Sequence, residues 1–132
     1  MKIYESAENY LETIFMLKKR NGTVRAIDIA NELKYSKASV SIAMKNLREN
    51  GYIENDAEGN ILLLPRGEEI AKKMYERHTV ISKWLMRMGV PEEKALSDAC
   101  RMEHVISEES FEAIKRCAEH NHICPSLKSC NE

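Results

Sequence analysis

Three residue types that bind transition metals stand close together late in the chain. Cys100, Glu103 and His104 are spaced so that, on a continuous helix, a thiolate, a carboxylate and an imidazole project from one face. This mixture of donors suits Fe(II), Co(II), Ni(II) or Zn(II) better than Ca(II) or Mg(II), which prefer oxygen alone. One helix cannot close a coordination sphere, so further ligands must come from elsewhere. The alternative is that Cys100 is a small core residue, while Glu103 and His104 pair with solvent or a neighbouring base.

The composition of the chain is that of a folded protein with two unlike halves. Its 132 residues, 43% of them apolar, fit one or two small domains. We find no signal peptide or membrane-spanning run, so we expect a cytoplasmic location, where the four cysteines are thiols or metal ligands rather than disulfides. Through Val90 there are 15 Lys and Arg against 12 Asp and Glu, and from Pro91 onward 5 against 9. A basic first part suggests a polyanion as partner, and an acidic second part suggests a cation.

The first 50 residues carry three helical patterns. Apolar residues recur at helical spacing from Tyr4 to Lys19, and again in two shorter segments on either side of Lys34-Tyr35. Ser36 has the residue type and the place of an N-cap for the third helix, and Gly51 can end that helix in a left-handed conformation. Two short helices with matched apolar faces and a turn of about three residues form a helix-turn-helix.

A hairpin and then longer helices are expected beyond this unit. Residues 52–54 and 60–64 flank a turn-rich loop, so we expect two strands that make the unit a winged helix. Pro65 marks the exit from the wing. The helices expected after it run from about Gly67 to Met88, from Pro91 in a first-turn position to about Val105, and onward from an N-cap at Ser107. The predicted fold is therefore mostly α, with a winged helix-turn-helix domain over residues 1–66, a helical domain over 67–120 and a Cys/His-containing tail over 121–132.

The third helix is the candidate DNA-reading element. The side chains of its first two turns reach base edges: a lysine for guanine or phosphate, hydroxyls that donate or accept, and a methyl for thymine. Other basic residues would contact phosphates, which set affinity and register. The alternative is a winged helix used only for protein docking, but the exposed face of this helix is basic and hydroxylated rather than apolar. The residues assigned to the DNA surface are Arg25, Ser36, Lys37, Ala38, Ser39, Ser41, Lys45 and Arg48.

Several segments together resemble the iron- and manganese-dependent repressors related to the diphtheria toxin repressor and the manganese transport regulator. The resemblance runs from about Ser6 to Ala118, and the segment Ala99-Cys100-Arg101-Met102-Glu103-His104 is similar to the metal-ligand helix of the iron-sensing branch. Other segments that carry it are residues 8–15, 29–41, 77–78 and 89–93. The resemblance implies a metal-dependent repressor, not an enzyme, that binds a double-stranded DNA operator, an inverted repeat, as a homodimer. Its second domain would bind metal and dimerise.

The same resemblance implies a set of metal ligands drawn from both domains. Asn9 departs from the pattern, because the iron branch usually has Met there and the manganese branch Asp, and an amide oxygen is a weaker, neutral donor. Without the resemblance, we would interpret Asn9 and Glu12 as part of a solvent-exposed helix face, and His78 as a core histidine whose hydrogen bonds are satisfied. The implied ligands are Asn9, Glu12, His78, Cys100, Glu103 and His104.

Two further departures narrow the expected metal chemistry. The three-domain iron repressors have a second site near His78, but Ser82 and Leu96 occupy its first-domain positions here, so we expect no such site. What remains is a two-domain repressor with Cys100 where the manganese branch has Glu. Because thiolate favours later metals over Mn(II), we expect Fe(II) as cofactor first and Mn(II) second, with Co(II), Ni(II) or Zn(II) possible in vitro. Metal would clamp the first domain to the second and act as corepressor.

The C-terminal tail holds a second group of potential ligands beyond the resemblance. Four Cys and His residues fall within eight positions and a fifth follows, which could bind Zn or Fe but fits no standard zinc knuckle. The alternative is a frayed, polar terminus with incidental thiols. These residues are Cys117, His120, His122, Cys124 and Cys130.

Two other functions stay open from the residues alone. A Cys-Glu-His cluster could support thiol chemistry in an enzyme, although the sequence has no Gly-rich phosphate loop and no nucleophile elbow. A metal-independent winged-helix regulator with Cys100 as an oxidation sensor is the second alternative. DNA binding that depends on metal would separate all three.

Overall fold

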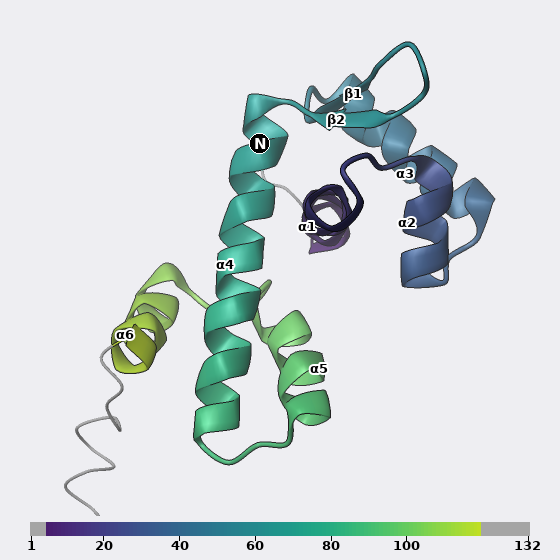
Figure 1. Cartoon of the computed structure of the whole chain (residues 1–132). Coiled ribbons are helices and arrows are strands. Elements are labelled where there is room, and N and C mark those ends of the chain that lie inside the picture. The colour runs from purple at the N-terminus through teal and green to yellow at the C-terminus, as the bar shows by residue number, and fades with distance from the viewer. Residues whose placement is uncertain (1–4, 120–132) are drawn as a thin grey trace, which may run out of the picture. The chain divides into compact units, whose positions relative to one another are not determined.

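The structure, a computed structural model, describes residues 5–119 of the chain. Its elements run α1 (Glu5–Asn21), α2 (Ala26–Leu33), α3 (Lys37–Glu49), β1 (Ile53–Asn55), β2 (Ile61–Leu63), α4 (Pro65–Arg87), α5 (Glu92–Met102) and α6 (Glu108–Glu119) (Figure 1). The expected fold class, mostly α with a winged helix-turn-helix, is confirmed. The chain divides into two compact units after Tyr75, inside α4, whereas the domain boundary predicted from the sequence lies between residues 66 and 67, in the first turn of that helix. None of the described helices is long and apolar enough to cross a membrane.

The turn between α2 and α3 is fixed by residues at both of its ends. Lys34 closes α2 in a left-handed conformation, with φ 59° and its backbone N–H donating to the Ala30 carbonyl. Ser36 is the N-cap that the sequence predicted, because its Oγ accepts a hydrogen bond from the Ser39 backbone N–H at 3.1 Å. The extended backbone of Ser36 then starts α3 at Lys37. These local bonds set the direction of the candidate recognition helix.

The end of α3 leads directly into the wing. Gly51 takes a φ of 79°, and the next backbone N–H, from Tyr52, donates back to Leu47 at 3.0 Å, so the last carbonyls of α3 are satisfied as predicted. The two wing strands pair antiparallel with Ile53 opposite Leu63. After β2, Pro65 is the first residue of α4, where its missing N–H costs nothing.

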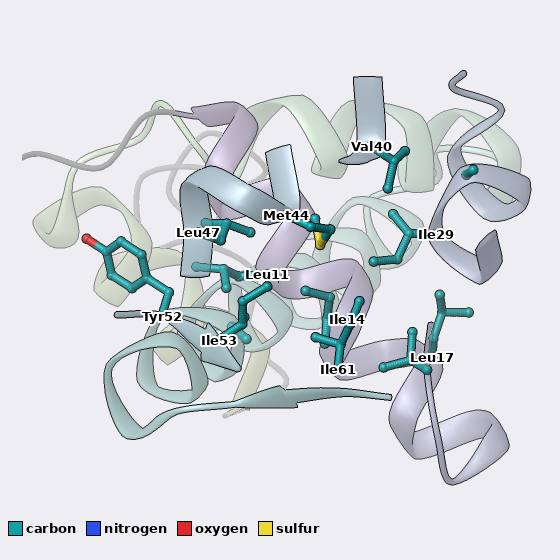
Figure 2. Packing of buried hydrophobic residues seen from close by; sticks show 13 residues of the cluster. Leu11, Ile14, Leu17, Ile29, Val40, Met44, Leu47, Tyr52, Ile53 and Ile61 are labelled. Atoms are coloured by element: carbon teal, nitrogen blue, oxygen red, sulfur yellow. The ribbon is translucent and has the colours of Figure 1, made fainter. Parts of the chain in front are cut away.

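The first unit is built around one apolar core. Buried side chains from α1, α2, α3, both strands and the first turns of α4 form a single cluster. Figure 2 shows these side chains converging on Leu11 and Ile14 of α1. Since α1 is central to this core, a change in its position is transmitted to α3 and to the wing by direct packing. The labelled members are Leu11, Ile14, Leu17, Ile29, Val40, Met44, Leu47, Tyr52, Ile53 and Ile61.

The second unit, which begins at Glu76, has a smaller core. Ile81 of α4, Ala99 of α5 and Phe111 of α6 are buried together. Pro91 precedes α5 as its N-cap rather than standing in the first turn as expected, and its carbonyl accepts from the Ala95 N–H at 2.8 Å. The predicted cap of α6 is confirmed: the Ser107 Oγ accepts from the Ser110 N–H at 3.1 Å.

Helix α5 ends at Met102, before the expected end near Val105. Glu103 is its C-cap and still has helical dihedral angles, but the backbone N–H groups of Val105 and Ile106 both donate to the Met102 carbonyl. The carbonyls of Glu103 and Ile106 accept instead from the side chain of Arg77. The segment that carries two of the predicted ligands is therefore a turn, not a helix.

Candidate metal centre and nucleic-acid interface

Glu103 is the centre of a cluster of potential ligands in the second unit. The residue is 0% exposed, and its two carboxylate oxygens face two different imidazoles. Oε2 lies 3.3 Å from Nδ1 of His78 on α4, and Oε1 lies 3.4 Å from Nε2 of the adjacent His104. The His104 side chain is 2% exposed and that of His78 is 21% exposed. Within the second unit, the structure thus places the predicted ligands His78 and His104 beside Glu103.

The donor types of this cluster suit a divalent transition metal, and each of the two nitrogen–oxygen pairs is spaced as two ligands of one ion would be. With metal–ligand bonds of about 2.0–2.2 Å, neighbouring ligand atoms at octahedral or tetrahedral angles stand about 2.8–3.6 Å apart, a range that includes both observed nitrogen–oxygen separations. The His78 Nδ1 is buried, and its contact with Glu103 lacks the geometry of a hydrogen bond. Two imidazoles and a carboxylate suit Mn, Fe, Co, Ni or Zn rather than Ca or Mg.

Cys100 lies on α5, shortly before Glu103, but in a different environment. Cys100 is exposed, whereas Glu103 is fully buried. The role of Cys100 as a ligand stays a prediction.

The predicted ligands on α1 belong to the first unit. Asn9 and Glu12 are one turn apart, and Glu12 is buried whereas Asn9 is partly exposed. The backbone carbonyl of Asn9 accepts a hydrogen bond from the Thr13 hydroxyl at 2.8 Å. The role of both residues as metal ligands stays a prediction.

The remaining positions considered for metal binding are those of the second site, Ser82 and Leu96, and the cysteines and histidines of the tail. Ser82 is buried and donates to the Thr79 carbonyl, while Leu96 is exposed, so neither position offers a ligand of the second-site type. Of the tail residues, Cys117 is partly exposed on α6 and forms no disulfide with another described cysteine. His120, His122, Cys124 and Cys130 lie outside the described residues.

The residues assigned to DNA reading all lie on one element or beside it. Ser36, Lys37, Ala38, Ser39 and Ser41 are exposed around the start of α3. The Ser36 and Ser39 hydroxyls are hydrogen-bonded to each other at 2.9 Å. A surface pocket of about 270 Å³ between α2 and α3 is lined by Ala26, Ile27, Lys37 and Ser41. Lys45, further along α3, is also exposed.

One exposed residue of α3 was missed by the sequence reasoning. Ile42 is 64% exposed, so the outer face of the helix is not purely basic and hydroxylated. Its position between Ser41 and the buried Met44 could have revealed it, because Val40 and Met44 already define the buried stripe at a spacing of four. An exposed branched side chain on a recognition helix is suited to contact with a thymine methyl.

Basic residues beside α3 are tied to the wing. The Arg25 Nε donates to the Asn60 side chain at 3.3 Å, and an Arg48 Nη donates to the Asn55 side chain at 3.0 Å. Backbone and side-chain hydrogen bonds from Asn60 lower the pKa of Asp56 at the wing tip, with the Glu58 N–H and the charge of Arg25 adding to this. Both arginines are thus held at the wing in positions from which phosphate oxygens can be bound.

Comparison with protein families identifies both halves of the chain. Residues 2–59 match the model described as "Iron dependent repressor, N-terminal DNA binding domain". Residues 64–129 match "Iron dependent repressor, metal binding and dimerisation domain". Together the two matches cover nearly all of the chain.

Similar proteins with curated names are transcriptional regulators. The chain is 31% identical over 109 residues to the HTH-type transcriptional regulator MntR of Lysinibacillus sphaericus, covering 83% of this chain and 78% of that protein. It is 34% identical over 111 residues to the transcriptional regulator MntR of Escherichia coli, covering 84% and 72% respectively.

Solved structures show the same fold. The manganese regulator SloR has a TM-score of 0.76 at 25% identity over 95% of this chain, and IdeR of T. acidophilum has a TM-score of 0.71 at 25% identity over 86%. The chain covers 58% and 53% of those two chains. The winged helix with basic and hydroxyl side chains falls in the matched DNA-binding domain, and the cluster of His78, Glu103 and His104 falls in the matched metal-binding domain. The chain therefore belongs to the iron-dependent repressor family, metal-dependent transcriptional regulators that include MntR and are not enzymes.

Proposed function

We propose that this protein is a repressor for which Fe(II) or Mn(II) is the corepressor, held by Glu103, His104 and His78 together with Glu12 and Asn9. The observation that carries the proposal is the fully buried Glu103, each of whose carboxylate oxygens faces a different imidazole. A carboxylate with an imidazole nitrogen close to each of its oxygens is a donor set that divalent transition metals bind.

The position of α1 gives this metal site a route to DNA binding. Glu12 and Asn9 project from the helix whose Leu11 and Ile14 form the centre of the first unit's core. If Glu12 is held by the same cation as Glu103, α1 is restrained, and α3 is restrained with it through packing. The recognition helices can then have two arrangements, one that fits DNA and one that does not. Metal favours the first because it binds that arrangement more tightly.

The DNA-bound form that we propose is a homodimer on an inverted repeat. Two copies of α3 would enter successive major grooves about one helical turn apart, with Lys37, Ser39 and Ile42 near base edges. Arg25, Lys45 and Arg48 would bind phosphates. The dimer would form through the second domain, which matches a family model described as a dimerisation domain.

The choice between Fe(II) and Mn(II) depends on Cys100. A thiolate ligand favours Fe(II), which the residue types put first. The exposed position of Cys100 and the buried nitrogen and oxygen donors around Glu103 suit Mn(II) equally well. A similar structure is that of a protein named as a manganese regulator.

Metal-dependent DNA binding tests the proposal directly. Duplexes selected by the protein from a random library in the presence of Mn(II) serve as probes, and fluorescence anisotropy is measured anaerobically with Fe(II), Mn(II), Co(II), Ni(II), Zn(II) or chelator. We expect Fe(II) or Mn(II) to raise the affinity and Glu103→Gln to remove that response. Glu93→Gln, at an exposed carboxylate in the first turn of α5, is the matched control and should respond as wild type does. Wild-type binding that is equally strong in chelator would refute the proposal.

A further inference from the structure

Arg77 is a buried arginine that stands directly before His78 on α4. The residue is 6% exposed, and its guanidinium lies over the Phe111 ring, 5.3 Å from the ring centroid. Burial of a permanently charged side chain is costly and is tolerated where hydrogen bonds compensate it. The role of Arg77 can therefore be inferred from the hydrogen bonds that its side chain makes.

The side-chain hydrogen bonds of Arg77 run through its two terminal nitrogens and reach the segment after α5. One Nη donates to the backbone carbonyls of Glu103 at 3.0 Å and Ile106 at 3.1 Å. The other donates to a carboxylate oxygen of Glu108 at 3.2 Å. The Nε has no hydrogen-bond partner among the described residues. One side chain thus spans both ends of the turn 103–106 and the first residue of α6.

This turn carries Glu103 and His104 and follows the last residue of α5. The Glu103 carbonyl is at the C-terminal end of a helix, where backbone carbonyls lack partners and carry partial negative charge. Arg77 supplies that partner from the same helix that supplies His78. The backbone that bears two potential ligands is therefore fixed relative to the helix that bears the third.

We propose that Arg77 is a positioning residue for the metal centre: it holds the turn 103–106 so that Glu103 faces His78, and it links this turn to the start of α6. The inference rests on the proposed function, because it assumes that this cluster binds the metal. Since binding couplings are reciprocal, metal binding should also steady the start of α6 through Arg77 and Glu108. Lysine cannot replace it, because one ammonium nitrogen cannot reach three oxygens arranged around a planar fork.

Arg77→Lys tests the proposal, with Arg101→Lys as matched control. Arg101 lies on α5 next to Cys100, but its side chain is 76% exposed and pairs with Asp98. Anaerobic Co(II) titrations give the dissociation constant and the visible spectrum, and thermal unfolding without metal gives stability. We expect Arg77→Lys to weaken Co(II) binding roughly 10- to 100-fold and to change the spectrum, as removal of a residue that orients ligands does. Arg101→Lys should match wild type. A Co(II) affinity and spectrum unchanged in Arg77→Lys, even with lowered stability, would overturn the proposal.

Two further variants keep the result interpretable. If Arg77→Lys does not fold, Glu108→Gln can be used instead. It weakens the ion pair between Arg77 and Glu108, whose side chain is half-exposed, and should lower Co(II) affinity several-fold. Unchanged affinity in that case would refute the positioning role. Glu103→Gln separates this inference from the proposed function. If Glu103→Gln binds Co(II) as wild type does, the metal site is assigned to the wrong residues. If Glu103→Gln loses Co(II) binding while Arg77→Lys keeps it, only the role given to Arg77 is wrong.

Discussion

Gly67, in the first turn of α4, stands against the backbone of Tyr52, and a single added methyl group tests that contact. An ideal Cβ at position 67 would overlap the Tyr52 carbonyl oxygen, lie 3.1 Å from the carbonyl carbon, and lie 3.4 Å from the Leu11 Cδ2. The carbonyl cannot simply turn away, because it accepts the hydrogen bond from the Leu64 N–H at 3.0 Å. Gly67→Ala must therefore push apart the start of α4 and the start of the wing.

The magnitude follows from opposing contributions. Overpacking against a fixed backbone atom costs about 1–3 kcal/mol. Weakening the Leu64–Tyr52 hydrogen bond adds up to about 1 kcal/mol. Alanine is better than glycine in a helix interior by up to about 1 kcal/mol, but in the first turn this gain is smaller. The steric cost is larger, so we expect Gly67→Ala to lower the free energy of unfolding by about 1–3 kcal/mol.

Urea unfolding followed by circular dichroism measures this difference. The midpoint should fall while the slope stays unchanged, since the surface exposed on unfolding is the same. Glu69→Ala, at an exposed position in the same helix, should change stability by less than about 0.5 kcal/mol. If Gly67→Ala is as stable as wild type, or more stable, the close approach of α4 to Tyr52 does not exist in solution.

The remaining predictions concern the turn of the helix-turn-helix, the reading surface and the metal. Lys34→Gly should stabilise the protein by up to ~1 kcal/mol, because glycine takes the φ of 59° without steric strain; a lower urea midpoint would contradict this. Changing both Lys37 and Ser39 to Ala should weaken binding to selected duplexes by ~1–3 kcal/mol for each base that these side chains no longer reach, without altering Co(II) affinity; weaker metal binding instead would contradict the role given to α3. Co(II) should give near-ultraviolet charge-transfer absorption from the Cys100 thiolate, and Cys100→Glu should remove it and shift activation toward Mn(II). A band that survives in Cys100→Glu would show that another cysteine holds the Co(II).

Much of the first unit and several helix ends could be predicted because their signals are local. The Ser36 and Ser107 caps each bond a backbone N–H three residues away, and Gly51 and Gly89 take the left-handed conformations that end helices. Such bonds form within one turn of chain, so residue type and spacing are enough to place them. The period of apolar residues then assigns the buried face of each helix.

The contacts that build the candidate metal centre are not local and could not be placed this way. Arg77 reaches a carbonyl 26 residues away and a carboxylate 31 residues away. No sequence pattern identifies either group as a partner of Arg77, since every residue has a backbone carbonyl. The resemblance to known repressors supplied His78 as a partner for Glu103, but spacing alone predicted neither that pair nor the residue that holds it in place.

The same limit explains why residue types left the metal undecided. The spacing of Cys100, Glu103 and His104 predicts one shared face only if the helix continues, and α5 ends at Met102. Beyond that point Arg77 donates to the backbone carbonyls of Glu103 and Ile106; the Glu103 side chain is fully buried, whereas Cys100 is exposed on the regular helix. A preference for Fe(II) requires the Cys100 thiolate, a soft donor, to bind the same cation as the carboxylate and imidazole donors. The selectivity of the site therefore depends on how far the turn 103–106 lets a cation bound at Glu103 approach the Cys100 thiolate, and a change at Arg77 should alter metal preference as well as affinity.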